Sequence, residues 1–276
     1  MAAIVKRLTA AGLADVDFTA ASLDEAAAFE PRHGVYTVSN THRRTQALLL
    51  DAHLDRLEDS ARREGFALRF DRKRLRQALR RMIVDSSYEE ARFRISAPGD
   101  SPGEMLLSIE PFRPPAPALI QRGARCATAA DVARLNPASK ASEWMHIRRA
   151  LASARPPDIY ETFIVSEDDR ILEGLSSNFY AIEDGELRTA GAQILAGIAR
   201  QVVIETCAAI IPLRLEAPLR ANIRRFSETF LTSSSRGIIP VVAIDGIAIG
   251  DGAPGKITAQ LRSAYERWVA AHLEEI

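Results

Sequence analysis

The sequence predicts an α+β protein with two domains, and three observations support this prediction. The chain has 276 residues, about twice the usual length of one domain. Segments with the apolar spacing of amphipathic helices alternate with short apolar segments of strand length. A segment with four prolines, residues 111–123, separates two such parts and is expected to be extended. We therefore expect a smaller N-terminal α/β domain over 1–113, a linker over 114–123 and a larger C-terminal domain over 124–276.

The first part is expected to contain two helices and an antiparallel hairpin. Residues 51–65 have apolar residues three and four positions apart, with Asp51 as a suitable N-cap and Gly65 as a suitable stop. A second amphipathic pattern follows at once and is rich in charged residues. The further elements expected here are a helix over 73–84, strands over 91–96 and 104–112, and a turn over 97–103.

The second part alternates helices and strands, with no internal repeat. Asp245-Gly246 is a typical turn pair for a hairpin. The expected helices cover 143–154, 197–210 and 257–273. The expected strands lie within 161–166, 171–174, 176–190, 227–234 and the hairpin 240–252.

Charge and cysteine content exclude several classes of protein. The 36 basic and 36 acidic residues cancel, so the chain as a whole has no charge bias toward nucleic acid or anionic membrane. No apolar run is long enough to span a bilayer, and the first residues do not resemble a secretory signal. Cys126 and Cys207 are far apart and suit neither a disulfide framework nor a metal site. We expect a cytoplasmic protein without a bound metal.

Three features of the second part suggest chemistry. Lys140 is one of four lysines and lies among short polar residues. The Glu173-Gly174 pair places a carboxylate at the end of an apolar strand, beside a residue that permits close backbone approach. Residues 195–200 open a helix whose free N–H groups can bind an anion. Each has a plain structural explanation on its own, but an amine, a carboxylate and a phosphate cup together suit pyridoxal phosphate.

Several strings are similar to those of class IV pyridoxal-phosphate enzymes, the group of branched-chain aminotransferase, D-amino-acid transaminase and aminodeoxychorismate lyase. The strings occur in the family's order over about residues 34–265: HLDRLEDSA, KASEWM, ILEGLSSNFYAI, LAGIARQVVIE and ETFLTSSSRGIIPVVAIDG. The resemblance implies a two-domain fold whose larger domain has a pseudo-barrel of strands. It also implies a homodimer that acts on small amino and keto acids.

Position by position, the resemblance implies roles for individual residues. Lys140 matches the lysine that forms the Schiff base and moves the substrate proton, and Glu173 matches the carboxylate that pairs with the pyridine nitrogen. Arg56 matches the phosphate-binding arginine, whose planar fork suits a phosphate. The remaining residues that match cofactor contacts are Ser177, Asn178, Gly197, Ile198, Ala199 and Ser234.

The chain departs from the family at two places near these residues. Ala199 stands where many members have a threonine, so one hydroxyl of the cup is lost while the backbone amide remains. Glu143 and Trp144 stand where members commonly have asparagine and, in branched-chain enzymes, tyrosine. Trp144 is expected either to contact the cofactor or substrate, or to be a core aromatic.

The expected substrate contacts come from both parts of the chain. Alternation places Arg92 and Arg94 on one face of a strand, a geometry that suits a carboxylate. Ala97 stands where D-amino-acid transaminases and the lyase have a carboxylate-binding arginine, which argues against both. Tyr36 matches a pocket aromatic or a strand-core residue, and Arg236 a residue of the substrate entrance or of the surface.

The leading hypothesis is a transaminase that moves an amino group between an amino acid or amine and a 2-keto acid through a Schiff base on Lys140. An aminodeoxychorismate lyase that eliminates pyruvate would use the same residues. A third hypothesis is a catalytically impaired relative that acts as a binding protein, which the changes at Ala199, Glu143 and Trp144 would explain.

Overall fold

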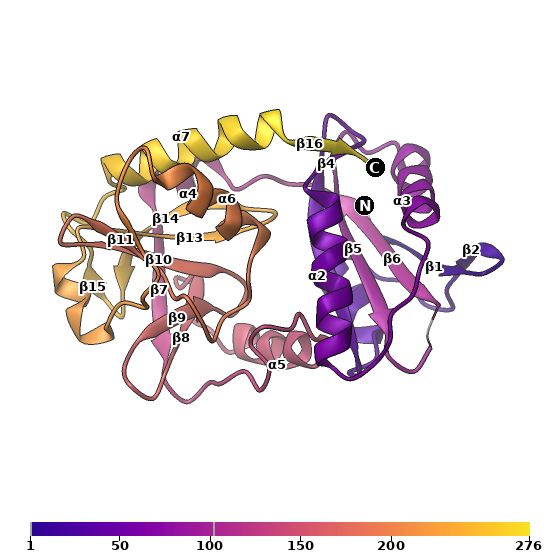
Figure 1. Cartoon of the computed structure of the whole chain (residues 1–276), viewed down its shortest axis with the longest axis horizontal. Helices are drawn as coiled ribbons and strands as arrows, with labels where there is room; N and C mark the ends of the chain where they lie inside the picture. The colour runs from indigo at the N-terminus through magenta and orange to yellow at the C-terminus, as the bar shows by residue number, and fades with distance from the viewer. Residues whose placement is uncertain (1, 102) are drawn as a thin grey trace. The chain divides into compact units, whose positions relative to one another are not determined.

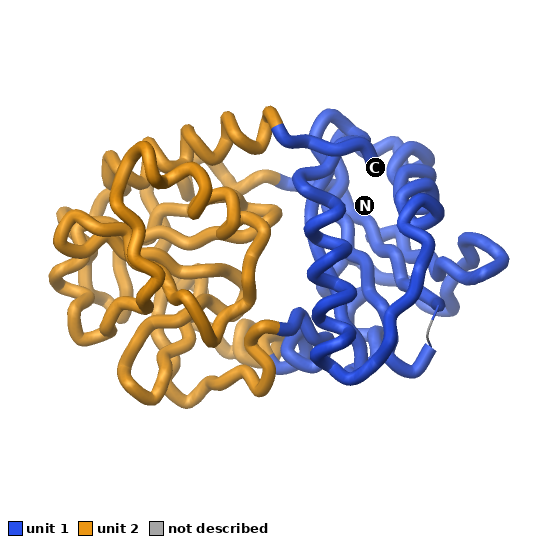
Figure 2. The backbone as a smooth tube through the Cα atoms, viewed as in Figure 1, with its two compact units in different colours: residues 1–113, 139–147, 272–276 blue, residues 114–138, 148–271 orange. Residues whose placement is uncertain are grey.

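The computed structural model describes residues 2–101 and 103–276, so Pro102 of the expected turn lies outside the described residues. The described chain forms two compact units, coloured separately in Figure 2. Unit 1 consists of Met1–Arg113, Ser139–Ile147 and His272–Ile276, and unit 2 of Pro114–Ala138 and Arg148–Ala271. The expected domain boundaries therefore differ from these units. The segment that carries Lys140, and the end of the chain, belong to unit 1 and not to the larger C-terminal unit.

Unit 1 contains a seven-stranded sheet with the order β16-β4-β3-β5-β6-β1-β2, in which the described strands pair antiparallel. Figure 1 labels most of these strands, beside helices α2 and α3. The elements of unit 1 are β1 (Ile4–Thr9), β2 (Gly12–Asp15), α1 (Leu23–Ala26), the 3-10 helix η1 (Ala27–Phe29), β3 (Gly34–His42), β4 (Gln46–Leu48), α2 (Leu50–Arg63), α3 (Arg72–Ser86), β5 (Ala91–Pro98), β6 (Met105–Pro111) and β16 (Leu273–Glu275).

The core of unit 1 lies between the sheet and the two long helices. Leu54 of α2, Leu79 of α3 and Phe93 of β5 are fully buried in one hydrophobic cluster. Burying each such side chain contributes about 2 kcal/mol. Both helices were expected, but the N-cap position of α2 is Leu49, in a left-handed conformation, and not Asp51. Asp51 instead pairs with arginines of α3.

Unit 2 contains a barrel, as expected. Within the described residues, six strands in the order β10-β13-β14-β7-β8-β9 close on themselves through a pairing of β9 with β10. The strands of unit 2 are β7 (Ala124–Ala129), β8 (Glu161–Val165), β9 (Ile171–Gly174), β10 (Asn178–Glu183), β11 (Glu186–Arg188), β12 (Leu213–Arg214), β13 (Glu228–Ser233), β14 (Gly237–Ile244) and β15 (Ile247–Ala248). The α+β class and the two-domain class IV fold with its pseudo-barrel are thereby confirmed.

The proline-rich segment is not extended throughout. Pro117 begins a short helix, because proline is tolerated in the first turn, where no N–H is needed. The helices that begin or lie in unit 2, with the 3-10 helix η2, are α4 (Pro117–Arg122), α6 (Ile198–Cys207), η2 (Arg220–Arg225) and α7 (Lys256–Ala271). Helix α5 (Ser142–Ser153) begins in the middle segment of unit 1.

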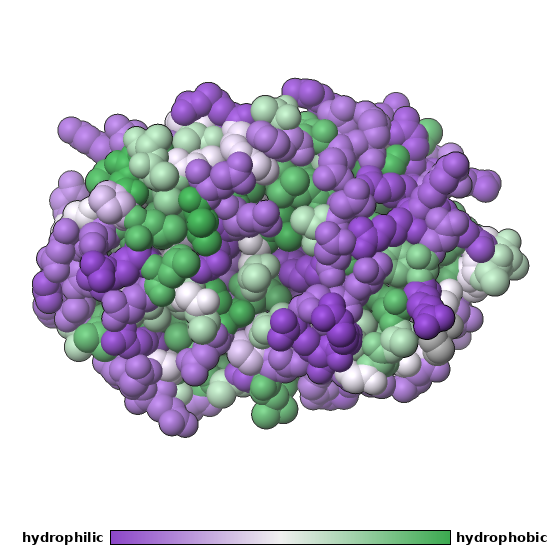
Figure 3. Space-filling view, viewed as in Figure 1, coloured by the Kyte–Doolittle hydropathy of each residue, from purple (hydrophilic) through white to green (hydrophobic). Residues whose placement is uncertain are grey.

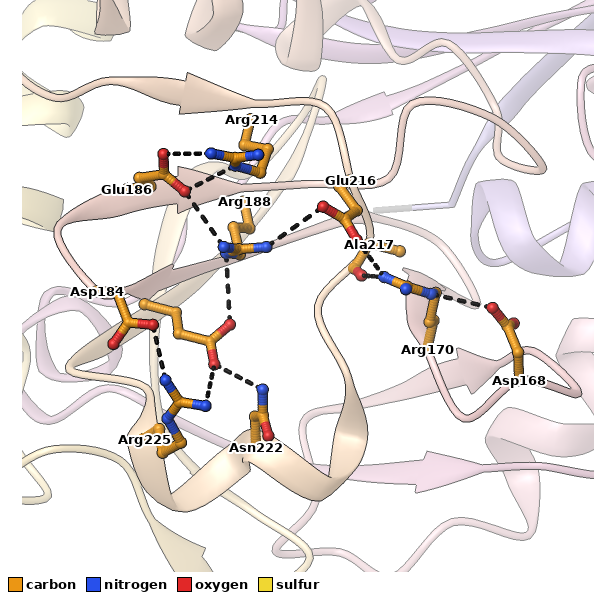
Figure 4. A network of polar contacts seen from close by, with 11 residues as sticks. Asp168, Arg170, Asp184, Glu186, Arg188, Arg214, Glu216, Ala217, Asn222 and Arg225 are labelled. Carbon is orange, nitrogen blue, oxygen red and sulfur yellow. Dashed lines mark hydrogen bonds and ion pairs between the residues drawn. The ribbon is translucent and has the colours of Figure 1, made fainter.

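Charged side chains form a network over the edge of unit 2 (Figure 4). At its centre Glu183, whose side chain is 4% exposed, accepts a hydrogen bond of 2.7 Å from Asn222 Nδ2. The same carboxylate pairs with Arg188 at 3.4 Å and with Arg225 at 3.7 Å. Two arginines therefore neutralise this buried charge at the end of β10.

The surface mixes polar and apolar side chains. On the face shown in Figure 3, green apolar residues are scattered among purple hydrophilic ones. Among residues 2–101 and 103–276, no helix combines the length and apolar character that crossing a membrane requires. The large apolar side chains with the greatest exposure are Phe29, Val84, Leu135, Ile147 and Leu215.

Candidate active site

The backbone of Lys140 is held on both sides within unit 1. Its carbonyl accepts a hydrogen bond of 3.1 Å from the N–H of Tyr36, and its own N–H donates to Ser60 Oγ at 3.1 Å. The next residue, Ala141, forms a β-bridge with Val35 of β3. The Lys140 ammonium lies 4.7 Å from the centroid of the Tyr36 ring. A strand and a buried helix serine therefore fix the place from which this amine extends.

Helix α2 presents a polar face to this part of unit 1, because His53, Arg56 and Ser60 are three and four positions apart. Arg56 Nη2 donates to Thr37 Oγ1 at 3.3 Å, and His53 Nδ1 lies 2.7 Å from the same hydroxyl. His53 is fully buried. Burial, with the positive charges of Arg56 and Lys140, holds the pKa of His53 well below its usual value. His53 was not singled out from the sequence, although it stands in the HLDRL string.

Glu173 lies at the end of β9 in unit 2, where its carboxylate is buried with two kinds of partner. Oε1 accepts a hydrogen bond of 2.6 Å from Arg134 Nη1, and Oε2 accepts one of 3.1 Å from the N–H of Leu195. The Glu173 and Arg134 side chains are 4% and 6% exposed. Sequence reasoning missed Arg134, because a single arginine in a loop carries no local signal of its partner.

The N-terminus of helix α6 forms a cup. Gly197 occupies the N-cap position and, among the residues that the structure describes, no side chain caps it. Asn178 Nδ2 donates to the Leu195 carbonyl at 2.9 Å, which ties the loop before the helix to β10. A Cβ at Gly197 would lie 2.1 Å from Asn178 Oδ1, so only glycine fits here without displacement. The first-turn amides, those of Ile198 and Ala199 included, suit an anion.

Ser177, Ser234 and Arg236 lie in two turns of the barrel. Ser177 precedes β10, and its hydroxyl donates to the carboxylate of Glu161 at 3.2 Å. Ser234 lies in the turn between β13 and β14. Arg236, two residues later, donates to the carbonyl of Ser176 at 2.8 Å and pairs with Glu161 at 3.4 Å. The expected substrate role of Arg236 is not what its contacts indicate, because its guanidinium is bound within unit 2.

Arg92 and Arg94 share one face of β5, as the alternation predicted, but each has a carboxylate partner in unit 1. Arg92 pairs with Glu110 at 3.0 Å. Arg94 is buried, where its Nε donates to Glu30 Oε1 at 2.7 Å and its guanidinium carbon lies 3.7 Å from the centroid of the Tyr36 ring. The expectation that Arg94 grips a substrate carboxylate is therefore wrong in this structure, because Glu30 already neutralises it.

The aromatic residues expected near the substrate are buried in unit 1. Tyr36 is 3% exposed and belongs to an apolar cluster with Ala27 and Met145. Trp144, in the first turn of α5, is 7% exposed. Its neighbour Glu143 pairs with Arg32 at 2.8 Å. The core-aromatic alternative for Trp144 agrees with this burial.

Comparison with known proteins gives the family. A family model described as amino-transferase class IV matches residues 34–244. The chain is 26% identical over 248 residues to D-alanine aminotransferase of Listeria monocytogenes, covering 84% of this chain and 85% of that protein.

Two solved structures have the same fold. A putative branched-chain amino acid aminotransferase from Thermotoga maritima matches with a TM-score of 0.79 and 24% identity, covering 96% of both chains. A branched-chain amino acid aminotransferase from T.th., solved with pyridoxamine 5′-phosphate, matches with a TM-score of 0.81 and 18% identity, covering 100% of this chain and 99% of that chain. Because the family model spans most of the chain, this protein belongs to the class IV aminotransferases, enzymes that transfer amino groups with pyridoxal 5′-phosphate.

Proposed function

We propose that the chain catalyses transamination between an amino acid and a 2-keto acid, with Lys140 as the catalytic amine. The observation that carries this proposal is the frame around Lys140. Its backbone is held by the N–H of Tyr36 and by the buried hydroxyl of Ser60. Lys73 and Lys256, by contrast, are exposed, and Lys6 pairs with Asp15. A proton carrier must return to one place in each half-reaction, and a fixed backbone provides this.

The residues present fit pyridoxal phosphate. The Gly197 cup has a helix N-terminus for a phosphate, and a Cβ at its first position would fill it. Arg56 adds a planar cation whose fork suits phosphate oxygens. Glu173 is a buried carboxylate that accepts hydrogen bonds from Arg134 and Leu195, and a carboxylate is what a protonated pyridine nitrogen needs. Ser177, Asn178 and Ser234 stay predictions as direct contacts.

When bound, the cofactor supplies an aldehyde for the amine and a ring that withdraws electrons from the substrate. Lys140 binds that aldehyde, and its Nζ then accepts the substrate's α-proton and returns it one atom away. Nζ must be uncharged to accept the proton, and the positive charge of Arg56 nearby favours the uncharged amine. Glu173 stays ionised beside Arg134 and holds the positive charge of the ring in place.

We propose an amino acid with an apolar side chain as the donor. The named relatives are D-alanine and branched-chain aminotransferases, and their names share this chemistry. Tyr36 lies against Ala27, Met145 and Val38, which provide an apolar wall. Arg94 is already neutralised by Glu30, so an acidic side chain has no cation there. A panel of L- and D-alanine, valine and leucine, with glutamate and lysine as contrasts, tests the donor and its stereochemistry.

The test of the reaction is single turnover with an amino donor alone. The wild-type chain is expected to lose its bound-cofactor absorbance band and to release a keto acid in equal amount. Lys140→Ala is expected to lose both the band and the turnover, whereas Lys256→Ala, at an exposed lysine, is expected to keep both. A Lys140→Ala chain with normal turnover would overturn the proposal. Pyruvate release from aminodeoxychorismate without loss of the band would indicate the lyase, and absence of any band a binding protein.

We also propose a homodimer in the cytoplasm. The class IV resemblance implies the dimer, and light scattering on the purified chain tests it, with a monomeric mass as the contrary result. The buried thiols of Cys126 and Cys207, both unbridged, support a reducing compartment.

A further inference from the structure

Glu161, the first residue of β8, is a buried carboxylate that connects separate segments of unit 2. Its side chain is 1% exposed. Oε2 accepts hydrogen bonds from Ser176 Oγ at 2.7 Å and from Ser177 Oγ at 3.2 Å. The carboxylate also pairs with Arg236 at 3.4 Å and with Arg155 at 3.5 Å. One acidic side chain therefore binds the turn before β10 and the turn after β13.

The first of these turns fixes Glu173. Glu173 and Asn178 are paired directly across β9 and β10, and the N–H of Gly174 donates to the Ser177 carbonyl at 2.7 Å. A Cβ at Gly174 would lie 2.2 Å from Ser177 Oγ and 2.9 Å from Glu161 Cγ. The turn is thus packed directly against the carboxylate of Glu161, and a shift of that carboxylate must move the end of β9.

The same turn leads to the helix cup. Glu173 accepts from the N–H of Leu195, and Asn178 donates to the carbonyl of Leu195. Leu195 is two residues before Gly197, the N-cap of α6. The position of the cup is therefore set by two side chains that flank the turn held by Glu161.

The second turn carries Ser234. Arg236 Nε donates to Ser233 Oγ at 2.7 Å, and its Nη2 donates to the Ser176 carbonyl at 2.8 Å. Arg236 thereby joins the turn after β13 to the turn before β10, and Glu161 neutralises the arginine that makes this link.

A buried ion pair is a weak source of stability, because the cost of removing charges from water offsets their attraction. We propose that Glu161 is a positioning residue that holds the Glu173 strand end, the Gly197 cup and the Ser234 turn in the arrangement that binds the cofactor. The inference rests on the proposed function, because those three segments are its cofactor-binding segments. Glu161 itself acts through Ser176, Ser177 and Arg236.

The test compares Glu161→Gln with Glu183→Gln in the full-length chain. Both residues are buried glutamates on strands of the same sheet, and both pair with two arginines. Glu183 is at the far end of β10, about 16 Å along the strand from Asn178. An amide at position 161 keeps the shape of the side chain but loses the charge and presents a donor to other donors. Glu161→Asp keeps the charge, and Ser176→Ala removes one partner at an exposed position.

The measurement is the dissociation constant of pyridoxal phosphate, titrated into each apo-protein and followed by absorbance, together with the thermal midpoint of each apo-protein. Glu161→Gln is expected to weaken binding by about tenfold or more, since a lost hydrogen bond to a charged group has this effect. Ser176→Ala is expected to weaken binding by a few-fold, and Glu161→Asp less than Glu161→Gln. Glu183→Gln is expected to lower the midpoint while leaving the constant within twofold.

Equal constants for Glu161→Gln and Glu183→Gln would overturn the inference, whatever their midpoints. If Glu161→Gln does not fold, an unchanged constant in Ser176→Ala and Glu161→Asp would overturn it instead. A wild-type chain that binds no pyridoxal phosphate would overturn the proposed function, and this inference with it. Amide hydrogen exchange gives a second readout, since Gly174 and Leu195 are expected to exchange faster in Glu161→Gln alone.

Discussion

Lowering the pH from 7.5 to 5.5 is expected to destabilise unit 1 through His53. The imidazole is fully buried, and burial with the charges of Arg56 and Lys140 holds its pKa well below 6.5. The unfolded chain therefore binds a proton at this position below about pH 6.5, whereas the folded chain does not. Because the unfolded state binds more protons, the free energy of unfolding falls as the pH falls through this window.

The magnitude follows from the titration of the unfolded histidine. With the folded group neutral throughout, protonation of a group with an unfolded pKa of 6.5 costs about 1.4 kcal/mol between pH 7.5 and pH 5.5. This is a large part of the stability of a typical domain.

The assay uses the placement of the two tryptophans, since Trp144 belongs to unit 1 and Trp268 to unit 2. In a Trp268→Phe background, the fluorescence of Trp144 reports unfolding of unit 1 in urea. His53→Asn keeps a polar atom toward Thr37 but does not titrate. The difference in unfolding free energy between pH 7.5 and pH 5.5 is expected to shrink by about 1.4 kcal/mol in this variant.

His42→Asn is the matched control. The pKa of His42 is also lowered by burial, but the negative charge of Glu90 opposes this effect, so a smaller change in pH dependence is expected. If His53→Asn left the pH dependence unchanged, or changed it less than His42→Asn, the assignment of a buried neutral imidazole would be refuted.

Three further predictions concern buried groups. Glu30→Gln leaves Arg94 buried without its counter-charge, so unit 1 is expected to lose about 3 kcal/mol in the same Trp144 assay, and a loss under about 1 kcal/mol would contradict this. Gly197→Ala places a Cβ 2.1 Å from Asn178 Oδ1 and is expected to weaken the binding of pyridoxal phosphate at least about tenfold in a titration; unchanged affinity would remove the cup. Burial raises the pKa of Cys126 to about 12, so its reaction with a disulfide reagent at pH 8 is expected to be about a thousandfold slower in the folded chain than in urea, and comparable rates would count against it.

Much of the secondary structure could be predicted from local pattern, because apolar spacing and turn residues act over a few positions. The pattern over 51–65 predicted α2, which covers Leu50–Arg63, and the pattern over 91–96 predicted β5. The segment 111–123 shows where such reasoning fails. Its prolines deny ladder hydrogen bonds, but one of them also suits the first turn of a helix, and α4 begins there.

The family strings determined which residues were candidates for the site. Lys140 and Glu173 were both found in this way, and the cup at Gly197 also followed from the physics of helix N-termini. His53 was present in one of these strings but was overlooked. The sequence does not say that this imidazole is fully buried beside Arg56 and Lys140, which is what makes it neutral.

The sequence by itself determined the fold class, the family and the chemistry of the candidate residues, because these depend on residue type and spacing. Only the tertiary structure decided which charges neutralise one another. Glu30 and Arg94 are 64 residues apart, Arg134 and Glu173 are 39 apart, and Glu161 and Arg236 are 75 apart. A buried charge requires a partner, but any of 36 basic and 36 acidic residues fits that requirement until the fold brings one pair together.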